Sequence, residues 1–254
     1  MTHLSSQLYI LGVNSPTTHT ERPVLPSAPL LVILAMLLLR TGLLFAGNLL
    51  LTPLVGGYHR ALAWSNVTIV AVDLICLMAV RALLHRQGRS VRGVLAARAR
   101  DTGWALLCFV ILAVAFFAAT FLGNLIAYQG APPAPAGSGH PPLWLGIWAI
   151  SIMPVTIALA EELVYRGYAM DSLQGRFGAA GALLISAAFF GLQHSALTAW
   201  DPRAQLARFV ATFLGGVVLG LLFRWRKRLW PVVVAHWLLD VLGLGVPLLL
   251  GALG

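Results

Sequence analysis

Charge is scarce in this sequence, and acidic residues are the scarcest charged type. The 254 residues include only 8 Asp and Glu; charged side chains make up 10% of the chain and hydrophobic residues 59%. Soluble domains carry roughly a quarter charged residues, so this composition indicates an integral membrane protein. Strands that alternate apolar and polar residues, as in membrane barrels, are missing too. We therefore expect an all-α fold, because backbone groups in lipid must be satisfied internally.

Cysteine is nearly absent as well. Cys76 and Cys108 both fall within apolar stretches and give no disulfide framework, so we interpret them as small packing residues. The sequence also lacks a P-loop, an HExxH motif, an internal repeat and a separate soluble domain. Ser195 adjoins His194, but no G-x-S-x-G motif surrounds it, which argues against a serine nucleophile.

Long hydrophobic runs occupy most of the chain, and most can cross a bilayer core of about 30 Å at about 1.5 Å per helical residue. Residues 1–27 are polar, without the features of a signal peptide. Residues 28–254 are expected to form a single membrane domain. We predict a polytopic bundle of about seven transmembrane helices, beginning near Leu30, Leu62, Trp104, Leu143, Ala179, Leu206 and Leu229.

Most basic residues lie in connections between these runs, so the net charge of +9 does not indicate nucleic-acid binding. They gather in residues 81–100, at Arg176 and in residues 224–228. With seven spans these connections share one side, and the positive-inside rule makes it the cytoplasm. The segment 128–142 has no Asp, Glu, Lys or Arg and falls on the opposite side. We expect a cytoplasmic N-terminus and an external C-terminus, in a bacterial inner (cell) membrane.

Four acids fall within the predicted spans: Asp73, Glu161, Glu162 and Asp240. A charge at the bilayer centre costs roughly 3 kcal/mol even on a lenient insertion scale, so each acid needs a partner or a function. Arg40 and Asp73 both reach roughly 15 Å depth in adjacent spans, which favours an ion pair between them.

The stretch ALAEELVYRGYAM, residues 158–170, carries the other pairing signal. Glu162 and Arg166 share one helix face at i,i+4 spacing, with the acid first, which favours an ion pair. Glu161 points to a neighbouring face and has no basic residue at its own i+3 or i+4 position. Its partner must therefore come from another helix.

Two further motifs carry polar residues in spans. FGLQH places Phe190 and His194 on one helix face, and HWLLD does the same for His236 and Asp240. Counted from the predicted cytoplasmic turns, Glu161 and His194 stand at roughly 21 and 24 Å, and His236 and Asp240 at roughly 11 and 17 Å. These heights permit a catalytic cavity within the membrane. The helix that carries Glu161 must then have about thirty residues, and be tilted or project into the cytoplasm.

A carboxylate that faces two histidines in a low-dielectric cavity can perform hydrolysis. Glu161 with His194 can deprotonate a water and direct it at a carbonyl carbon, while His236 donates to the oxyanion. Metal-assisted hydrolysis is the competing chemistry, because two histidines and a carboxylate form a common catalytic zinc set. Its candidate ligands are Glu161, His194 and His236. The cofactor stays open between none and a divalent metal such as zinc.

The ordered motifs resemble those of the CPBP family (CAAX protease and bacteriocin-processing), also called Abi, whose best-known branch is the type II CAAX prenyl endopeptidases. The resemblance covers about Leu143 to Val241 and implies an all-helical intramembrane endopeptidase with a cavity open to the cytoplasmic side. It implies that Glu161 activates water, that His194 holds the same water and that His236 and Asp240 stabilise the oxyanion. Supporting roles fall to Glu162, Arg166 and Phe190.

Asp240 departs from the pattern of the prenyl-endopeptidase branch, which usually has asparagine there. An ionised aspartate cannot donate a hydrogen bond as asparagine can. Either Asp240 stays protonated, or it orients His236, or the site binds a cation. The difference also weakens the expectation of a prenylated substrate.

The function predicted is therefore that of an intramembrane peptidase, of the glutamate or the metallo type. Its expected partners are membrane lipid and a peptide or protein substrate, with prenylation left open. One rival is an ion- or proton-coupled transporter that uses the same acids and histidines. The other is a non-catalytic membrane protein with an immunity or scaffold role.

Overall fold

The computed structural model describes residues 28–133 and 140–254, and every regular element in them is helical. This confirms the expected all-α bundle. The polar segment 1–27 and part of the uncharged connection lie outside the described residues. The elements are α1 Leu30–Val55, α2 Tyr58–Arg86, α3 Val91–Leu95, η1 Ala99–Asp101, α4 Thr102–Tyr128, α5 Leu143–Ile150, α6 Ile152–Glu161, η2 Glu162–Met170, α7 Asp171–Gln193, η3 His194–Leu197, α8 Pro202–Arg226, α9 Trp230–Asp240, η4 Val241–Gly245 and α10 Val246–Leu253.

Six helices in the described residues are long and apolar enough to cross a membrane, and one of them, Leu143–Leu197, has 55 residues. This long helix is broken at Gly178, whose φ of 67° and ψ of 178° are not helical. The chain folds back there and brings the two segments together, so that the Ser186 hydroxyl donates to the carbonyl oxygen of Tyr165 at 2.8 Å. Dividing the helix at Gly178 gives seven spanning segments, as the sequence predicts.

The segment that carries the paired glutamates is interrupted a second time, between α5 and α6. Ser151 has a φ of −109° and a ψ of −79°, and Pro154 follows three residues later. A proline has no N–H to donate, and its ring clashes with the carbonyl four residues earlier, here that of Ile150. The interruption therefore has a local cause in the sequence.

Two stretches of π-helix lie beside the polar motifs. η2 begins at Glu162, and η4 begins directly after Asp240. Such wide turns change the direction in which side chains leave the helix, and they are frequent at functional sites. Neither π-helical stretch was predicted from the sequence.

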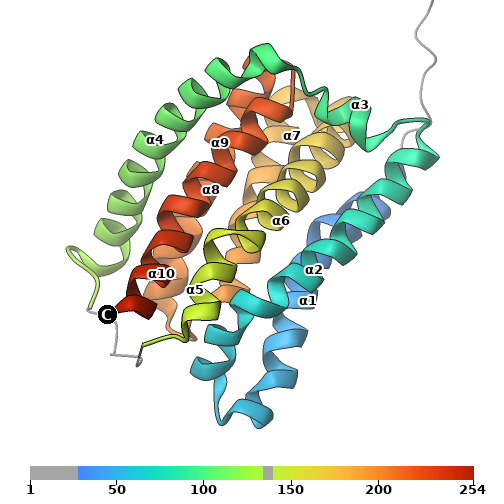
Figure 1. Cartoon of the computed structure of the whole chain (residues 1–254). Helices are drawn as coiled ribbons and strands as arrows, with labels where there is room; N and C mark the ends of the chain where they lie inside the picture. The colour runs from blue at the N-terminus through green and yellow to red at the C-terminus, as the bar shows by residue number, and fades with distance from the viewer. Residues whose placement is uncertain (1–27, 134–139) are drawn as a thin grey trace, which may run out of the picture.

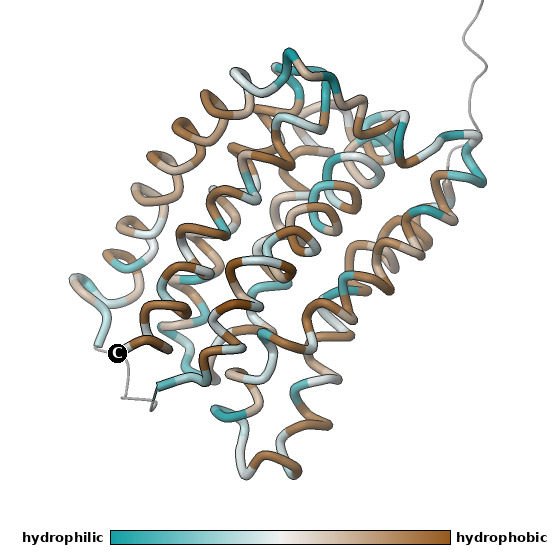
Figure 2. Tube along the Cα trace, in the orientation of Figure 1, coloured by the Kyte–Doolittle hydropathy of each residue, from teal (hydrophilic) through white to brown (hydrophobic). Residues whose placement is uncertain are grey.

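The helices lie side by side with α4 at one edge and α1 with α2 at the other, while α9, α10, α5 and α6 lie between them (Figure 1). Helix α8 packs against α4 and α7. Small residues allow close approaches, as is common between membrane helices. A Cβ atom at Gly123 on α4 would lie only 2.5 Å from the Ala207 carbonyl oxygen on α8. Hydrophobic residues run along most of the length of the helices (Figure 2), and many large hydrophobic side chains are exposed, as lipid contact requires.

The basic connections meet at one end of the bundle. Arg228 binds Asp101 at 2.7 Å, joining the α8–α9 connection to the segment before α4. Arg89 binds Asp171 at 2.9 Å, joining the α2–α3 connection to the start of α7. Arg224 also donates to the carbonyl oxygen of Ala179. The three connections therefore share one end, which we call the basic end.

Candidate active site

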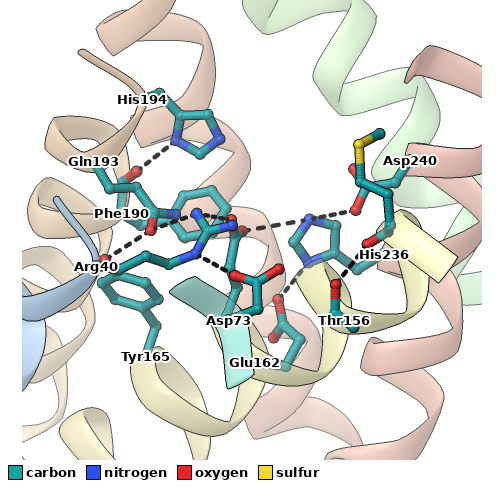
Figure 3. A network of polar contacts seen from close by, with 12 residues as sticks. Arg40, Asp73, Thr156, Glu162, Tyr165, Phe190, Gln193, His194, His236 and Asp240 are labelled. Carbon is teal, nitrogen blue, oxygen red and sulfur yellow. Dashed lines mark hydrogen bonds and ion pairs between the residues drawn. The ribbon is translucent and has the colours of Figure 1, made fainter. Parts of the chain in front are cut away.

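Glu162 organises one half of a buried polar cluster (Figure 3). Its Oε1 accepts from Arg166 Nη1 at 2.9 Å, which confirms the predicted i,i+4 ion pair. The same oxygen lies 2.8 Å from His236 Nδ1. Arg166 also donates to the carbonyl oxygen of Gly216 at 3.1 Å and lies 4.3 Å over the ring of Phe190. Glu162 thus fixes the orientation of the His236 ring, with Nε2 directed away from it.

Glu161 takes its partners from other helices, as its position on the helix requires. Its Oε1 lies 2.6 Å from Arg40 Nη1 on α1, and its Oε2 lies 3.7 Å from His236 Nε2 on α9. The Glu161 side chain is buried, yet Oε2 has no hydrogen-bond partner among the described residues. One carboxylate oxygen is therefore held, and the other is free to bind a ligand or a water.

Arg40 joins α1 to three other helices, α2, α6 and α7, in the middle of the bundle. Its Nε donates to Asp73 at 2.8 Å, which confirms the predicted ion pair. Its Nη1 donates to the Gln193 side-chain oxygen at 3.0 Å, and Tyr165 donates to the same oxygen at 3.0 Å. Depth along the predicted spans indicated only the pairing of Arg40 with Asp73, and the contact of Arg40 with Glu161 was not predicted.

His194 contacts the backbone through its ring nitrogen Nδ1, and its Nε2 makes no such contact in the described residues. Nδ1 lies 2.8 Å from the carbonyl oxygen of Phe190. Because a carbonyl oxygen can only accept, Nδ1 carries the proton, and Nε2 of the neutral ring is an acceptor. Among the described residues no ion pair joins His194 to Glu161, but both line one cavity.

Asp240 lies beside His236 without orienting it. Its Oδ2 is 3.7 Å from His236 Nε2, beyond a hydrogen bond, while Glu162 holds Nδ1. Glu162, and not Asp240, therefore orients the His236 ring. Asp240 Oδ2 has no hydrogen-bond partner among the described residues.

The three motifs face a cavity of about 660 Å³. Most of its lining is apolar and comes from α2, α4, α8 and α10 as well as from the motif helices. Arg208, six residues after the start of the apolar helix α8, also lines the cavity, and it was not among the predicted site residues. The polar lining residues are Ser65, Asn66, Thr120, Glu161, His194, Arg208, Thr212, His236 and Asp240.

The position of the cavity bears on membrane orientation. It is lined by residues 62–69 of α2, near the end of that helix remote from the basic end, and by residues 208–219 in the middle of α8. The cavity therefore extends from the glutamates away from the basic end.

The arrangement of the candidate metal ligands is unfavourable for zinc. In residues 28–133 and 140–254 no group of three or more His, Cys, Asp or Glu side chains is placed to hold a metal ion. Arg40 also contacts Glu161 directly, and its positive charge would repel a divalent cation bound there. The contact with Arg40 therefore disfavours a divalent cation at the Glu161 carboxylate.

The fold and the site define a polytopic helical membrane protein with a carboxylate–histidine cluster facing an internal cavity. Residues 142–242 match the family described as Type II CAAX prenyl endopeptidase Rce1-like. This match confirms the resemblance seen in the motifs and supports an intramembrane endopeptidase of the CAAX-protease type. Comparison with curated proteins gave no match, and comparison with solved structures gave none either.

Proposed function

We propose that the protein hydrolyses a peptide bond inside the membrane with a water activated by Glu161 and His194. The observation that carries the proposal is that Oε2 of buried Glu161 has no hydrogen-bond partner among the described residues, and that Glu161 lines the same cavity as His194 and His236. A water bound between Oε2 and the acceptor nitrogen of His194 would meet two bases. The surrounding apolar walls strengthen such contacts by excluding bulk water.

The chemical step follows from these positions. The water gives one proton to the Glu161–His194 pair, and the resulting hydroxide attacks the carbonyl carbon of the scissile bond. His236, held by Glu162, donates through Nε2 to the oxyanion when its ring is protonated, and a protonated Asp240 would add a second donor. As the C–N bond breaks, the leaving amine takes up the proton removed from water.

The substrate class is a peptide or protein with its scissile bond within the bilayer, and a farnesylated CAAX peptide is the first to be examined. We also propose that the protein lies in a bacterial cell membrane with its basic end in the cytoplasm. Under this topology the cavity extends toward the external leaflet.

The test is cleavage of a farnesylated CAAX peptide, its unprenylated form and a mixed peptide library by the full chain in lipid nanodiscs. Wild type, Glu161→Gln and His194→Ala are compared, each with and without a chelator. Arg81→Met, which alters an exposed residue of α2, is the control. Cleavage lost in both site variants and kept in the control supports the peptidase, and cleavage that survives the chelator supports water activation without a metal.

An uncut library would overturn the proposal, provided that a related peptidase cuts it under the same conditions. Ion flux in proteoliposomes would then test the transporter reading. An absence of flux as well would leave the immunity or scaffold role.

A further inference from the structure

The buried cluster contains more carboxylates than arginines. Arg40 and Arg166 face Asp73, Glu161, Glu162 and Asp240, an excess of two formal negative charges before His236 is protonated. Charges of one sign at such depth are costly unless each has a partner in contact. Arg166 serves Glu162, so Arg40 is the only arginine in contact with Glu161 among the described residues.

The contact made by Arg40 is selective for one oxygen. Arg40 Nη1 lies 2.6 Å from Oε1 of Glu161, which leaves Oε2 to the cavity. The guanidinium cannot swing away easily, because Asp73 holds Nε at 2.8 Å and Gln193 holds Nη1 at 3.0 Å. Its exposed fraction is 0%. Both Arg40 and Asp73 lie outside residues 142–242, in helices that the family match does not cover.

We propose that Arg40, fixed by Asp73 and Gln193, is a positioning residue that keeps Glu161 ionised and turns its Oε2 toward the water. The proposal rests on the proposed function and assigns to α1 and α2 a part in the reaction. If the role of Arg40 were only structural, it would neutralise Asp73 and would not affect the protonation of Glu161. The two readings differ in the pH at which Glu161 takes up a proton.

The sign of the effect follows from charge. Without Arg40, the charged form of Glu161 loses its closest cation, so the carboxyl group stays protonated to higher pH and is inactive there as a base. The acid limb of the kcat/KM profile should then move up by about one pH unit or more, the size expected for a close opposite charge. Arg40→Lys keeps the charge and should recover part of the shift.

The experiment compares wild type, Arg40→Met, Arg40→Lys and the double variant Arg40→Met with Asp73→Asn in nanodiscs. The double variant avoids an unpaired aspartate if the single one does not fold, because removing both partners of a buried pair is far less costly than removing one. Arg81→Met controls for loss of a positive charge elsewhere. Two readouts are taken: the pH profile of peptide cleavage, and infrared titration of the protonated carboxyl band that Glu161→Gln removes.

An upward shift of both the acid limb and the infrared band in the Met variants supports the proposal. An unchanged profile and band in a folded Met variant overturns it. If wild type cuts no peptide, the proposed function fails, but the infrared titration still decides whether Arg40 holds Glu161 ionised.

Discussion

Residues 142–242 and the three long helices before them build the same site in different ways. The matched part carries both glutamates, both histidines, Asp240 and Arg166, whose spacing marks them in the sequence. The earlier helices have no such motif, yet α1 supplies Arg40, α2 supplies Asp73 and α4 lines the cavity opposite. A family pattern thus locates the groups proposed to react, while their electrostatic partner and much of the cavity wall come from outside it.

Removing Glu162 should produce the largest effect within the matched part. Glu162→Ala leaves Arg166 buried without its carboxylate and frees the His236 ring. Breaking a buried pair in this way costs about 3–5 kcal/mol of folding stability, and we expect cleavage to fall at least ~100-fold, in the range of a lost acid–base group. Thermal unfolding in nanodiscs and kcat/KM measure the two effects.

The conservative change Glu162→Gln serves as its control. Gln keeps an acceptor oxygen for His236 and should retain more stability than Ala. Equal stability of wild type and Glu162→Ala would show that the cluster around Arg166 does not depend on this carboxylate.

Narrowing the cavity from the unmatched side tests whether α4 belongs to the substrate site. Ala113 lines the cavity, whereas its neighbour Val114 is 67% exposed. Ala113→Trp should raise KM about tenfold with a smaller change in kcat, because it blocks binding space without touching the reacting groups. Val114→Trp is the matched control, and equal kinetics for the two variants would remove α4 from the substrate site.

Within the matched part, Asp240→Asn tests whether Asp240 acts as a hydrogen-bond donor. Asparagine is the residue usual in the prenyl-endopeptidase branch, and it can donate to an oxyanion at any pH. If Asp240 works as a protonated donor, activity should change less than about tenfold at low pH, and the variant should gain at high pH relative to wild type. A loss at every pH would assign the negative charge of Asp240 a role of its own.

The smallest effect on activity is expected from two cysteine substitutions that report the orientation of the protein in the membrane. The substitution Arg92→Cys is at the basic end, and the substitution Gly130→Cys is at the opposite end of the bundle. With the basic end in the cytoplasm, a membrane-impermeant maleimide added to intact cells should modify only the cysteine at position 130, with activity unchanged. Modification of position 92 alone would reverse the orientation and direct the cavity toward the cytoplasm.

Local spacing made several features of the fold and site predictable. The hydrophobic runs defined the spans, Gly178 lies in the predicted turn between the fourth and fifth, and i,i+4 spacing gave the Glu162–Arg166 pair. Depth counting also paired Arg40 with Asp73. The π-helical stretches at Glu162 and after Asp240 were not predictable, because they depend on how neighbouring helices pack around a locally ordinary sequence.

The sequence by itself determined that the protein spans the membrane, which residues are too polar to lie there without partners, and that its basic connections share one end. Only the tertiary structure decided which partners meet. In it, His236 Nδ1 contacts Glu162 rather than Asp240, and Arg40 contacts Glu161. Spacing fixes the faces of a single helix, whereas contacts between helices depend on how each is rotated, tilted and shifted against the others.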